Sequence, residues 1–127
     1  MSRVVIDASA LLALVNGEEG AERVAEALDD ASISAVNLSE SVAKLADAGL
    51  PEEAIRQTLE PLGLEVTEFD EQLAWQAGLL RFSTKRTGLS FGDRACLALA
   101  QKLGVAAVTA DRDWRKLDVG VEVQLIR

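Results

Sequence analysis

Short apolar runs alternate with helical patterns along the whole chain, and this alternation constrains the fold more than any other feature of the sequence. Val4–Ile6, Ile33–Val36 and Ala106–Thr109 are the clearest of these runs. Runs of this length and composition are typical of strands that are buried on both faces. Strands that alternate with helices indicate a parallel sheet with helices on both of its faces. The sequence therefore predicts an α/β fold of three layers.

Apolar residues at spacings of three and four, with glycine, asparagine or proline at the segment ends, mark the expected helices. These helices cover residues 8–15, about 20–28, 37–48, 51–62, about 70–82 and 90–103. Two more exposed strands are expected, one at Leu64–Thr67 and one along Val121, Val123 and Leu125. The chain has 127 residues without a visible repeat or linker, and it fits a single domain over residues 1–127.

The chemistry open to the chain is limited by the absence of histidine. The sequence contains no histidine and one cysteine, Cys96. The residues needed for a zinc site of nitrogen and sulfur ligands, or for a Ser-His-Asp triad, are therefore missing from the sequence. Metal chemistry would have to use oxygen ligands, which favour hard cations such as Mg²⁺, Mn²⁺ or Ca²⁺.

The N-terminal segment and the single cysteine favour a cytoplasmic protein. No apolar run approaches the ~20 residues of a membrane-spanning helix, so no membrane association is expected. Asp7 interrupts the first apolar run, which is not typical of a secretory signal. Cys96 cannot form an internal disulfide, which agrees with a reducing compartment.

The charge of the chain is unevenly distributed. The net charge is −8, which is unusual for a protein that binds nucleic acid through a basic surface. Residues 1–71 contain sixteen Asp and Glu against four Lys and Arg, whereas residues 72–127 contain five against nine. The second half is therefore locally basic, and its cations are either ordinary surface charge or contacts for RNA. The candidates for such contacts are Arg86, Arg112, Arg115 and Lys116.

Four acidic residues are expected at one edge of the sheet. Asp7 directly follows the first strand, and Asp111 follows the strand at 106–109 by two residues. Glu40 and Asp93 lie in the first turns of helices that follow connections at the same edge. Ligands of open parallel sheets bind outside the carboxyl ends of the strands. The sequence thus places four carboxylates near one rim.

Each of these acids also has a purely structural interpretation. Asp7, Asp93 and Asp111 each suit the start of a helix, where a carboxylate accepts backbone hydrogen bonds. Glu40 follows Asn37 by three residues, which is the spacing of a capping box. Taken one at a time, the acids are explained by helix capping.

Two observations favour a metal site over four separate caps. On a helical wheel Glu40 points away from the apolar stripe of Leu38, Val42 and Leu45. In addition, four like charges gathered at one rim would repel one another unless cations lay between them. A two-metal phosphodiesterase needs such carboxylates to hold ions ~3.5–4 Å apart, one activating water and one stabilising the leaving oxygen.

The segments that carry these acids resemble the PIN-domain family, and most closely the VapC toxins of bacterial toxin–antitoxin pairs. The matching segments are Val4–Leu11, Ser34–Glu40, Leu89–Ala95 and Val108–Trp114. They occur in the family's order and spacing over nearly the whole chain. The resemblance implies a parallel five-stranded sheet between helices, which agrees with the pattern above.

The resemblance also implies a function and partners. It implies an endoribonuclease that depends on Mg²⁺ or Mn²⁺ and hydrolyses RNA phosphodiesters with a metal-activated water. Its partners would be an RNA substrate, a VapB-like antitoxin whose C-terminal segment lies across the active site, and a second copy in a homodimer. The implied metal ligands are Asp7, Glu40, Asp93, Asp111 and Asp113, and the implied supporting hydroxyls are those of Ser9 and Thr109.

Other classes of protein fit the sequence less well. A haloacid-dehalogenase-type phosphatase needs an acid two residues after Asp7, where this chain has Ser9. A dinucleotide-binding fold needs a glycine-rich first turn, and the turn after Asp7 contains no glycine. The alternative from another functional class is a PIN-like module that binds protein or RNA without catalysis. It ranks second, because loss of function usually erodes ligands and all four acids are present.

Overall fold

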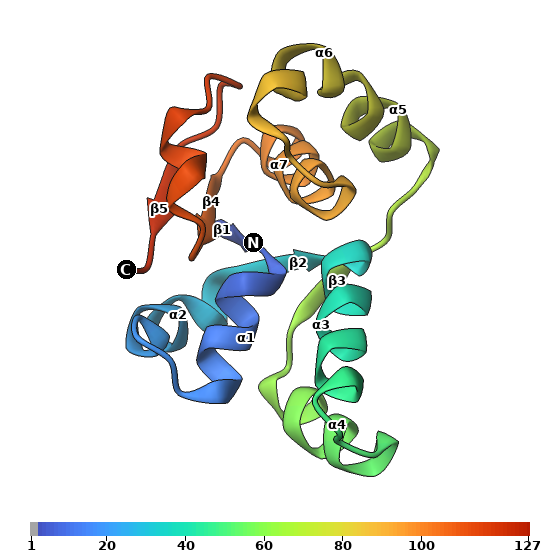
Figure 1. The fold of residues 1–127 in the computed structure, drawn as a ribbon, viewed down its shortest axis with the longest axis vertical. Helices are drawn as coiled ribbons and strands as arrows, with labels where there is room; N and C mark the ends of the chain where they lie inside the picture. Colours follow the sequence, from blue (N-terminus) through green and yellow to red (C-terminus); the bar gives the residue numbers. More distant parts are fainter. Residues whose placement is uncertain (1–2) are drawn as a thin grey trace.

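A parallel five-stranded sheet forms the centre of the molecule, which is described here over residues 3–127 of a computed structural model. The strand order is β3-β2-β1-β4-β5, and every pairing is parallel. Figure 1 shows the sheet between a lower group of helices, α1 to α4, and an upper group, α5 to α7. This arrangement confirms the predicted three-layer α/β fold.

The strands and helices alternate along the chain as the sequence pattern indicates. The strands are β1 (Val4–Ile6), β2 (Ala31–Ser34), β3 (Glu65–Thr67), β4 (Ala106–Thr109) and β5 (Val123–Leu125). The α-helices are α1 (Ala8–Asn16), α2 (Ala21–Ala27), α3 (Ala35–Asp47), α4 (Glu52–Leu59), α5 (Glu71–Leu79), α6 (Arg81–Thr84) and α7 (Phe91–Leu103). Short 3₁₀ turns are η1 (Leu28–Asp30), η2 (Glu60–Leu62), η3 (Lys85–Thr87) and η4 (Arg112–Lys116).

Consecutive residues of β1 pack into two separate cores, one on each face of the sheet. Val4 and Ile6 belong to the core that α1, α2, α3 and α4 cover. Val5 belongs to the other core, where it packs with residues of α5 and α7 and with Trp114 of η4. Because side chains alternate along a strand, a sheet with helices on both faces needs apolar residues at every position. The unbroken run Val4–Ile6 meets this requirement.

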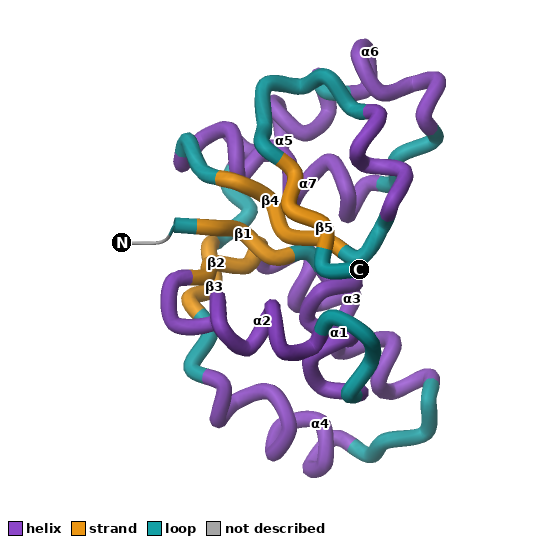
Figure 2. Tube along the Cα trace, turned by 90° about the vertical axis from the view of Figure 1, so that its left-hand side faces the viewer, coloured by secondary structure: helices purple, strands orange, loops and turns teal. Residues whose placement is uncertain are grey.

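In Figure 2 the strands lie side by side, with α4 and α6 at opposite ends of the view.

The boundary between β2 and α3 differs from the sequence prediction. Val36 was expected in a strand and Asn37 at the start of a helix, but β2 ends at Ser34 and α3 begins at Ala35. The hydroxyl of Ser34 accepts a hydrogen bond from the Val36 N–H at 3.2 Å and caps the helix there. Ser34 is therefore the N-cap, and the capping box expected between Asn37 and Glu40 is wrong.

The predicted helix at 70–82 is divided into α5 and α6. Leu80 separates the two, and its carbonyl accepts hydrogen bonds from the hydroxyls of Ser83 and Thr84 at 3.2 and 2.8 Å. Hydroxyls that bond to nearby backbone carbonyls compete with regular helical hydrogen bonding.

Within residues 3–127, no helix has the length and apolar character that crossing a membrane requires.

Two glycines with positive φ near the start of α2 differ in what surrounds them. At Gly20, with φ +94, an added Cβ would lie 2.5 Å from the Ile126 carbonyl oxygen. At Gly17, with φ +65, an added Cβ would meet nothing within 4 Å. Gly20 therefore allows Ile126, the residue after β5, to pack closely against the connection between α1 and α2.

We expect Gly20→Ala to destabilise the protein more than Gly17→Ala. Gly17→Ala should lower the free energy of unfolding by roughly 1–2 kcal/mol, because alanine is strained in the left-handed backbone conformation. Gly20→Ala should cause a similar loss from the backbone and a further loss of roughly 1–3 kcal/mol, because the added Cβ would overlap the backbone of Ile126. Urea unfolding of both variants measures the difference. Equal losses of stability would show that the close contact with Ile126 is unimportant.

Candidate functional site

Asp7 lies at the point where β1 gives way to α1, and three hydrogen bonds hold its carboxylate. One oxygen, Oδ1, accepts from the Ala10 N–H at 2.8 Å and from the Ser9 hydroxyl at 2.7 Å. The other, Oδ2, accepts from the Thr109 hydroxyl at 2.6 Å. Asp7 therefore caps α1, as its structural interpretation predicts, and is also tied to the end of β4.

The hydroxyls of Ser9 and Thr109 act in parallel on Asp7. The Ser9 hydroxyl donates to Asp7 and accepts from the Ala110 N–H at 2.9 Å. The Thr109 hydroxyl donates to Asp7 and accepts from the Asp111 N–H at 3.0 Å. Each hydroxyl has one proton, and each donates it to Asp7. The two hydroxyl oxygens lie 3.2 Å apart but therefore do not hydrogen-bond to each other.

Burial makes the Asp7 carboxylate unusual among the acids of the chain. The residue is 4% exposed. Burial raises the pKa of Asp7 from the ordinary 3.8 to about 6, against the lowering effect of the three hydrogen bonds, and the charge of Asp93 raises it further. The site thus contains a carboxylate whose negative charge is poorly solvated.

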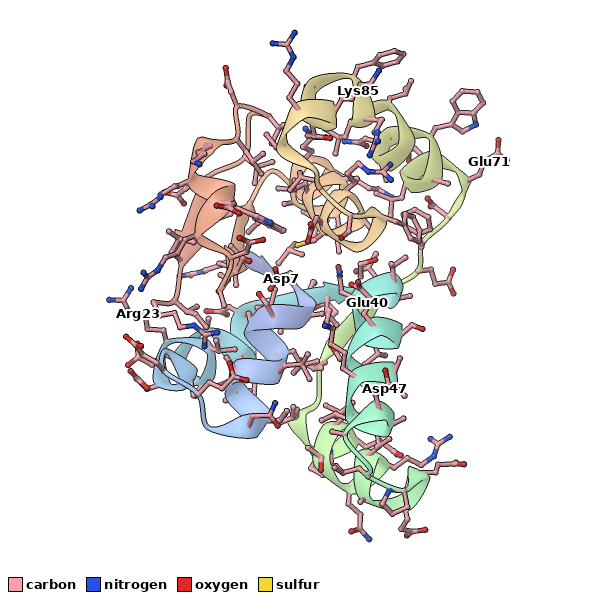
Figure 3. The ribbon with its side chains drawn as sticks, viewed as in Figure 1. Asp7, Arg23, Glu40, Asp47, Glu71 and Lys85 are labelled. Atoms are coloured by element: carbon pink, nitrogen blue, oxygen red, sulfur yellow. The ribbon has the colours of Figure 1, made fainter. Side chains whose placement is uncertain are left out.

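Glu40 reaches the cavity from α3. Its Oε1 accepts a hydrogen bond from Asn37 Nδ2 at 2.8 Å. The same Asn37 nitrogen donates to the Gly92 carbonyl oxygen of α7 at 3.0 Å. A side chain at Gly92 would overlap the Glu40 carboxylate. Figure 3 shows Asp7 and Glu40 near the centre of the molecule, whereas Asp47 lies further along α3 and Lys85 lies at the far end of the upper helices.

Asp93 and Asp111 both lie at helix starts and both line the cavity. Asp93 forms a capping box with Ser90 at the start of α7, so that the Ser90 N–H donates to Asp93 Oδ2 at 3.0 Å. Asp111 caps η4, and its Oδ1 accepts from the Asp113 N–H at 2.9 Å. The structural interpretation of these acids is therefore correct, and it does not prevent them from facing a common space.

A cavity of about 350 Å³ lies at the carboxyl edge of the sheet and brings the four predicted acids together. One further acid in its wall, Glu18, pairs with Arg127 at 2.9 Å. Lys44, one turn after Glu40, adds an ammonium group to the wall. The remaining carboxylates outnumber that ammonium, so the described wall of the cavity is strongly acidic. The lining residues are Asp7, Ala8, Ser9, Leu12, Glu18, Asn37, Glu40, Lys44, Ser90, Asp93, Asp111 and Arg127.

The donor set of this cavity fits a hard divalent cation. All its acidic ligands offer oxygen, which is what Mg²⁺ and Mn²⁺ prefer. The buried carboxylate of Asp7 would also gain from a nearby positive charge. In the part of the chain described, however, no three acidic side chains are close enough to form a ready-made ligand group. Binding a cation would therefore require some of these carboxylates to turn toward the others.

Several residues predicted to act at the site lie outside the lining of the cavity. The side chain of Asp113 is exposed, and its backbone N–H supports Asp111. Arg112 bonds through Nε to the Arg127 carbonyl oxygen at 3.2 Å, which places it beside the rim. The exposed candidates that neither line the cavity nor contact its lining in this way are Arg86, Arg115 and Lys116.

Sequence reasoning missed Asn37, Gly92, Lys44 and Arg127 as parts of the site. Asn37 suits a helix start as well as Ser34 does, and its side chain is available to donate to Glu40 because Ser34 caps α3 in the structure. Lys44 follows Glu40 by four residues, so its presence on the same helix face was available from the spacing. The positions of Gly92 and Arg127 depend on packing between distant elements, which no local pattern reveals.

The fold and this acidic cavity define a parallel α/β domain with a carboxylate site at the carboxyl edge of its sheet. A sequence profile described as the PIN domain matches residues 4–120. The chain belongs to the PIN domain family. No match was found among curated protein sequences.

Solved structures share this fold along their whole length. A DNA-bound VapBC complex from Salmonella typhimurium contains a chain that is 23% identical, with 100% of each chain covered and a TM-score of 0.78. VapBC-1 from Haemophilus influenzae is 19% identical, with 97% of each chain covered and a TM-score of 0.73. VapC20 from Mycobacterium tuberculosis, a toxin that cleaves the sarcin-ricin loop, is 21% identical over 94% of this chain and 98% of its own, with a TM-score of 0.72.

We expect Asp7→Asn to stabilise the metal-free protein at neutral pH. Because folding raises the pKa of Asp7 from 3.8 to about 6, the folded state binds this proton more tightly than the unfolded state. Stability therefore falls as the pH rises through that interval. The full penalty above it is on the order of 3 kcal/mol, and Asn avoids it, although it loses a hydroxyl contact.

Unfolding in urea with a chelator at about pH 7.5 and about pH 4 tests this expectation. Asp7→Asn should be more stable than wild type at the higher pH, and its advantage should shrink at the lower pH. A difference between the two proteins that does not change with pH would contradict the raised pKa.

Proposed function

We propose that this PIN-domain protein is a metal-dependent endoribonuclease that acts as the toxin of a VapC-type toxin–antitoxin pair. The observation that carries the proposal is the convergence of four carboxylates, from four separate segments of the chain, on one cavity. Membership of the PIN family and the likeness to VapBC structures support it. The sarcin-ricin loop cleaved by VapC20 supports RNA as the class of substrate.

The acids of the cavity would hold Mg²⁺ or Mn²⁺. The ion supplies neutralisation of the phosphate charge and activation of the attacking water. The hydroxyls of Ser9 and Thr109 fix the orientation of the Asp7 carboxylate, as hydrogen-bonded partners of metal ligands do in general. The proposed ligands are Asp7, Glu40, Asp93 and Asp111, and the exposed side chain of Asp113 would have to turn toward the cavity to act as a further ligand.

The cations around the cavity suit a path for the RNA backbone. Lys44 and Arg127 lie in the wall itself, where a phosphate would pass closest to the acids. Arg112 extends this basic character outward from the rim, since it bonds to the Arg127 carbonyl. We assign the more distant contacts with RNA to Arg86, Arg115 and Lys116, whose side chains are exposed.

A cognate VapB-like antitoxin is the proposed regulator of the enzyme in the cytoplasm. An acidic cavity is complementary to a basic peptide segment, and such a segment would compete with cations for the carboxylates. The VapBC structures that share this fold contain an antitoxin as well as a toxin. The antitoxin would therefore silence the site by occupying it.

We expect substitution of a cavity acid to abolish cleavage while substitution of a distant acid does not. Glu40→Gln and Asp93→Asn remove a ligand charge with little change of shape. Each should lower Mn²⁺-dependent RNA cleavage by more than the roughly 10–100-fold that loss of a ligand's supporting partner costs. Asp47→Asn is the matched control, because Asp47 is exposed on α3 and does not line the cavity. Gel assays of a structured RNA with Mn²⁺ or with chelator measure these rates.

The same assay separates the enzyme from a non-catalytic binding module. A wild-type protein that binds RNA but does not cleave it, with or without Mn²⁺, would favour the binding module. Expression in a bacterium adds a second readout. The wild type should slow growth and Glu40→Gln should not, so growth arrest by both would show that toxicity is independent of the site.

We further propose that the protein is a homodimer that forms through α5 and α6. Trp75, Leu79 and Phe82 form an exposed apolar stripe on these helices, with 66%, 53% and 86% of their surfaces accessible. Exposed apolar side chains in such a group mark interaction surfaces. Gly78, also exposed, leaves open space for the close approach of a second helix.

The charges at the two ends of this stripe favour a second copy as the partner. Glu68 and Glu71 lie at its beginning, and Lys85 and Arg86 lie at its end. In a two-fold symmetric pair with antiparallel helices, each acidic end faces the basic end of the other copy. The apolar centre would then be covered, and the flanking charges would be complementary.

We expect Leu79→Asp to convert the dimer into a monomer. A charge at the centre of the stripe would be buried without a partner in the dimer but would remain solvated in the monomer. Leu103→Asp is the matched control, because Leu103 is also exposed, at 42%, but lies at the end of α7 outside the stripe. Sedimentation velocity of the three proteins tests this surface. A monomeric wild type, or a dimeric Leu79→Asp variant, would contradict it.

A further inference from the structure

The buried side chain of Asn37 connects the helix that carries Glu40 with the helix that carries Asp93. Asn37 is 1% exposed. Its Nδ2 donates to Glu40 Oε1 at 2.8 Å and to the Gly92 carbonyl oxygen at 3.0 Å. Gly92 immediately precedes Asp93 in the first turn of α7. One amide group therefore fixes a carboxylate of α3 to the backbone beside a carboxylate of α7.

The orientation of this amide follows from its partners. Both are acceptors, so only the nitrogen end of the amide can face them. The other end, Oδ1, is buried and has no hydrogen-bond partner among the described residues. A buried acceptor without a partner costs stability. The two hydrogen bonds that Nδ2 donates offset this cost, and they are what Asn37 adds to this position.

Gly92 complements Asn37 from the opposite helix. The residue is buried, and a Cβ built on it would overlap the Glu40 carboxylate. The carboxylate therefore lies directly against the backbone of the first turn of α7. Gly92 does not have a positive φ, so the close approach of Glu40, and not backbone conformation, is the reason for glycine here.

We propose that Asn37 and Gly92 are positioning residues that seat the Glu40 carboxylate at a fixed place against the first turn of α7, the turn that carries Asp93. The proposal rests on the proposed function, in which Glu40 and Asp93 are both ligands at the divalent-cation site. Asn37 supplies the hydrogen bond that orients the carboxylate, and Gly92 supplies the space that it occupies. Partners of this kind orient metal ligands and influence metal affinity without contacting the ion.

A merely structural role predicts a different outcome from a positioning role. If Asn37 and Gly92 only pack α3 against α7, their substitution changes stability and leaves ion binding alone. Gly92→Ala separates the two roles well. The atoms that it would displace are at the flexible end of the Glu40 side chain, and alanine is a better helix former than glycine. The fold should persist while the carboxylate moves.

Mn²⁺ binding to the full chain, measured by calorimetry, tests the positioning role without relying on RNA cleavage. Asn37→Leu removes both donated bonds and the unpaired oxygen at similar volume, and Gly92→Ala displaces the carboxylate. Each should weaken Mn²⁺ binding by roughly 10–100-fold. Thr84→Val is the matched control, because Thr84 is equally buried but, among residues 3–127, its hydroxyl bonds to the Leu80 carbonyl alone. Its affinity for Mn²⁺ should equal that of wild type.

A Glu40→Ala background shows whether the effect passes through Glu40. In that background Asn37→Leu and Gly92→Ala should have no further effect on Mn²⁺ affinity, because there is no carboxylate left to seat. The same cycle read by urea unfolding in chelator gives a second measurement. Any stability lost in Gly92→Ala should be recovered when Glu40 is also truncated, and this comparison holds if Asn37→Leu fails to fold.

The possible failures are distinct from one another. Absence of Mn²⁺ binding by the wild-type protein would refute the proposed function and, with it, a role toward an ion. Binding by wild type that Asn37→Leu and Gly92→Ala leave unchanged would overturn the positioning role alone. Equal losses of Mn²⁺ affinity with and without the Glu40 side chain would also overturn it.

Discussion

The pairing of β1 with β4 is the interaction on which the site depends. Its register sets Ile6 beside Val108, so the next residues, Asp7 and Thr109, meet although they are 102 positions apart. The carboxylate is thereby enclosed at the end of two buried strands, where burial raises its pKa to about 6. The pairing that forms the centre of the sheet therefore also encloses the Asp7 carboxylate, whose negative charge the folded protein solvates poorly.

Capping and site chemistry are combined in three of the four acids, and Glu40 is the exception. Asp7, Asp93 and Asp111 each accept backbone hydrogen bonds at the start of a helix, so local structure already orients them. Glu40 lies in the second turn of α3 and accepts its hydrogen bond from the side chain of Asn37. Its position depends on contact between α3 and α7 and not on a helix end. The position of the Glu40 carboxylate therefore depends more on the packing of α3 against α7 than the positions of Asp7, Asp93 and Asp111 do.

The sequence was sufficient to predict the parallel sheet, its two covering layers and the gathering of four acids at one edge. Those predictions rest on the period of the apolar residues and on the rule that parallel strands end at the same edge. The start of α3 was misplaced because Ser34 and Asn37 are both good caps, and only the backbone decides between them. Gly92 and Arg127 escaped notice because their neighbours, Glu40 and Glu18, lie 52 and 109 positions away in the sequence.

The acidity of the cavity also determines how an anionic substrate can approach it. Four carboxylates and Lys44 line the cavity, while Arg127 is already paired with Glu18. A phosphate group would be repelled from such a wall, because charges in a partly enclosed cavity are weakly screened. Under the proposed function, a divalent cation reverses this repulsion, so that cation and RNA each favour the binding of the other. Such coupling is reciprocal by thermodynamic necessity. Under that proposal the net charge of −8 is compatible with a ribonuclease, since a bound cation would offset the acidity of the site where RNA would bind.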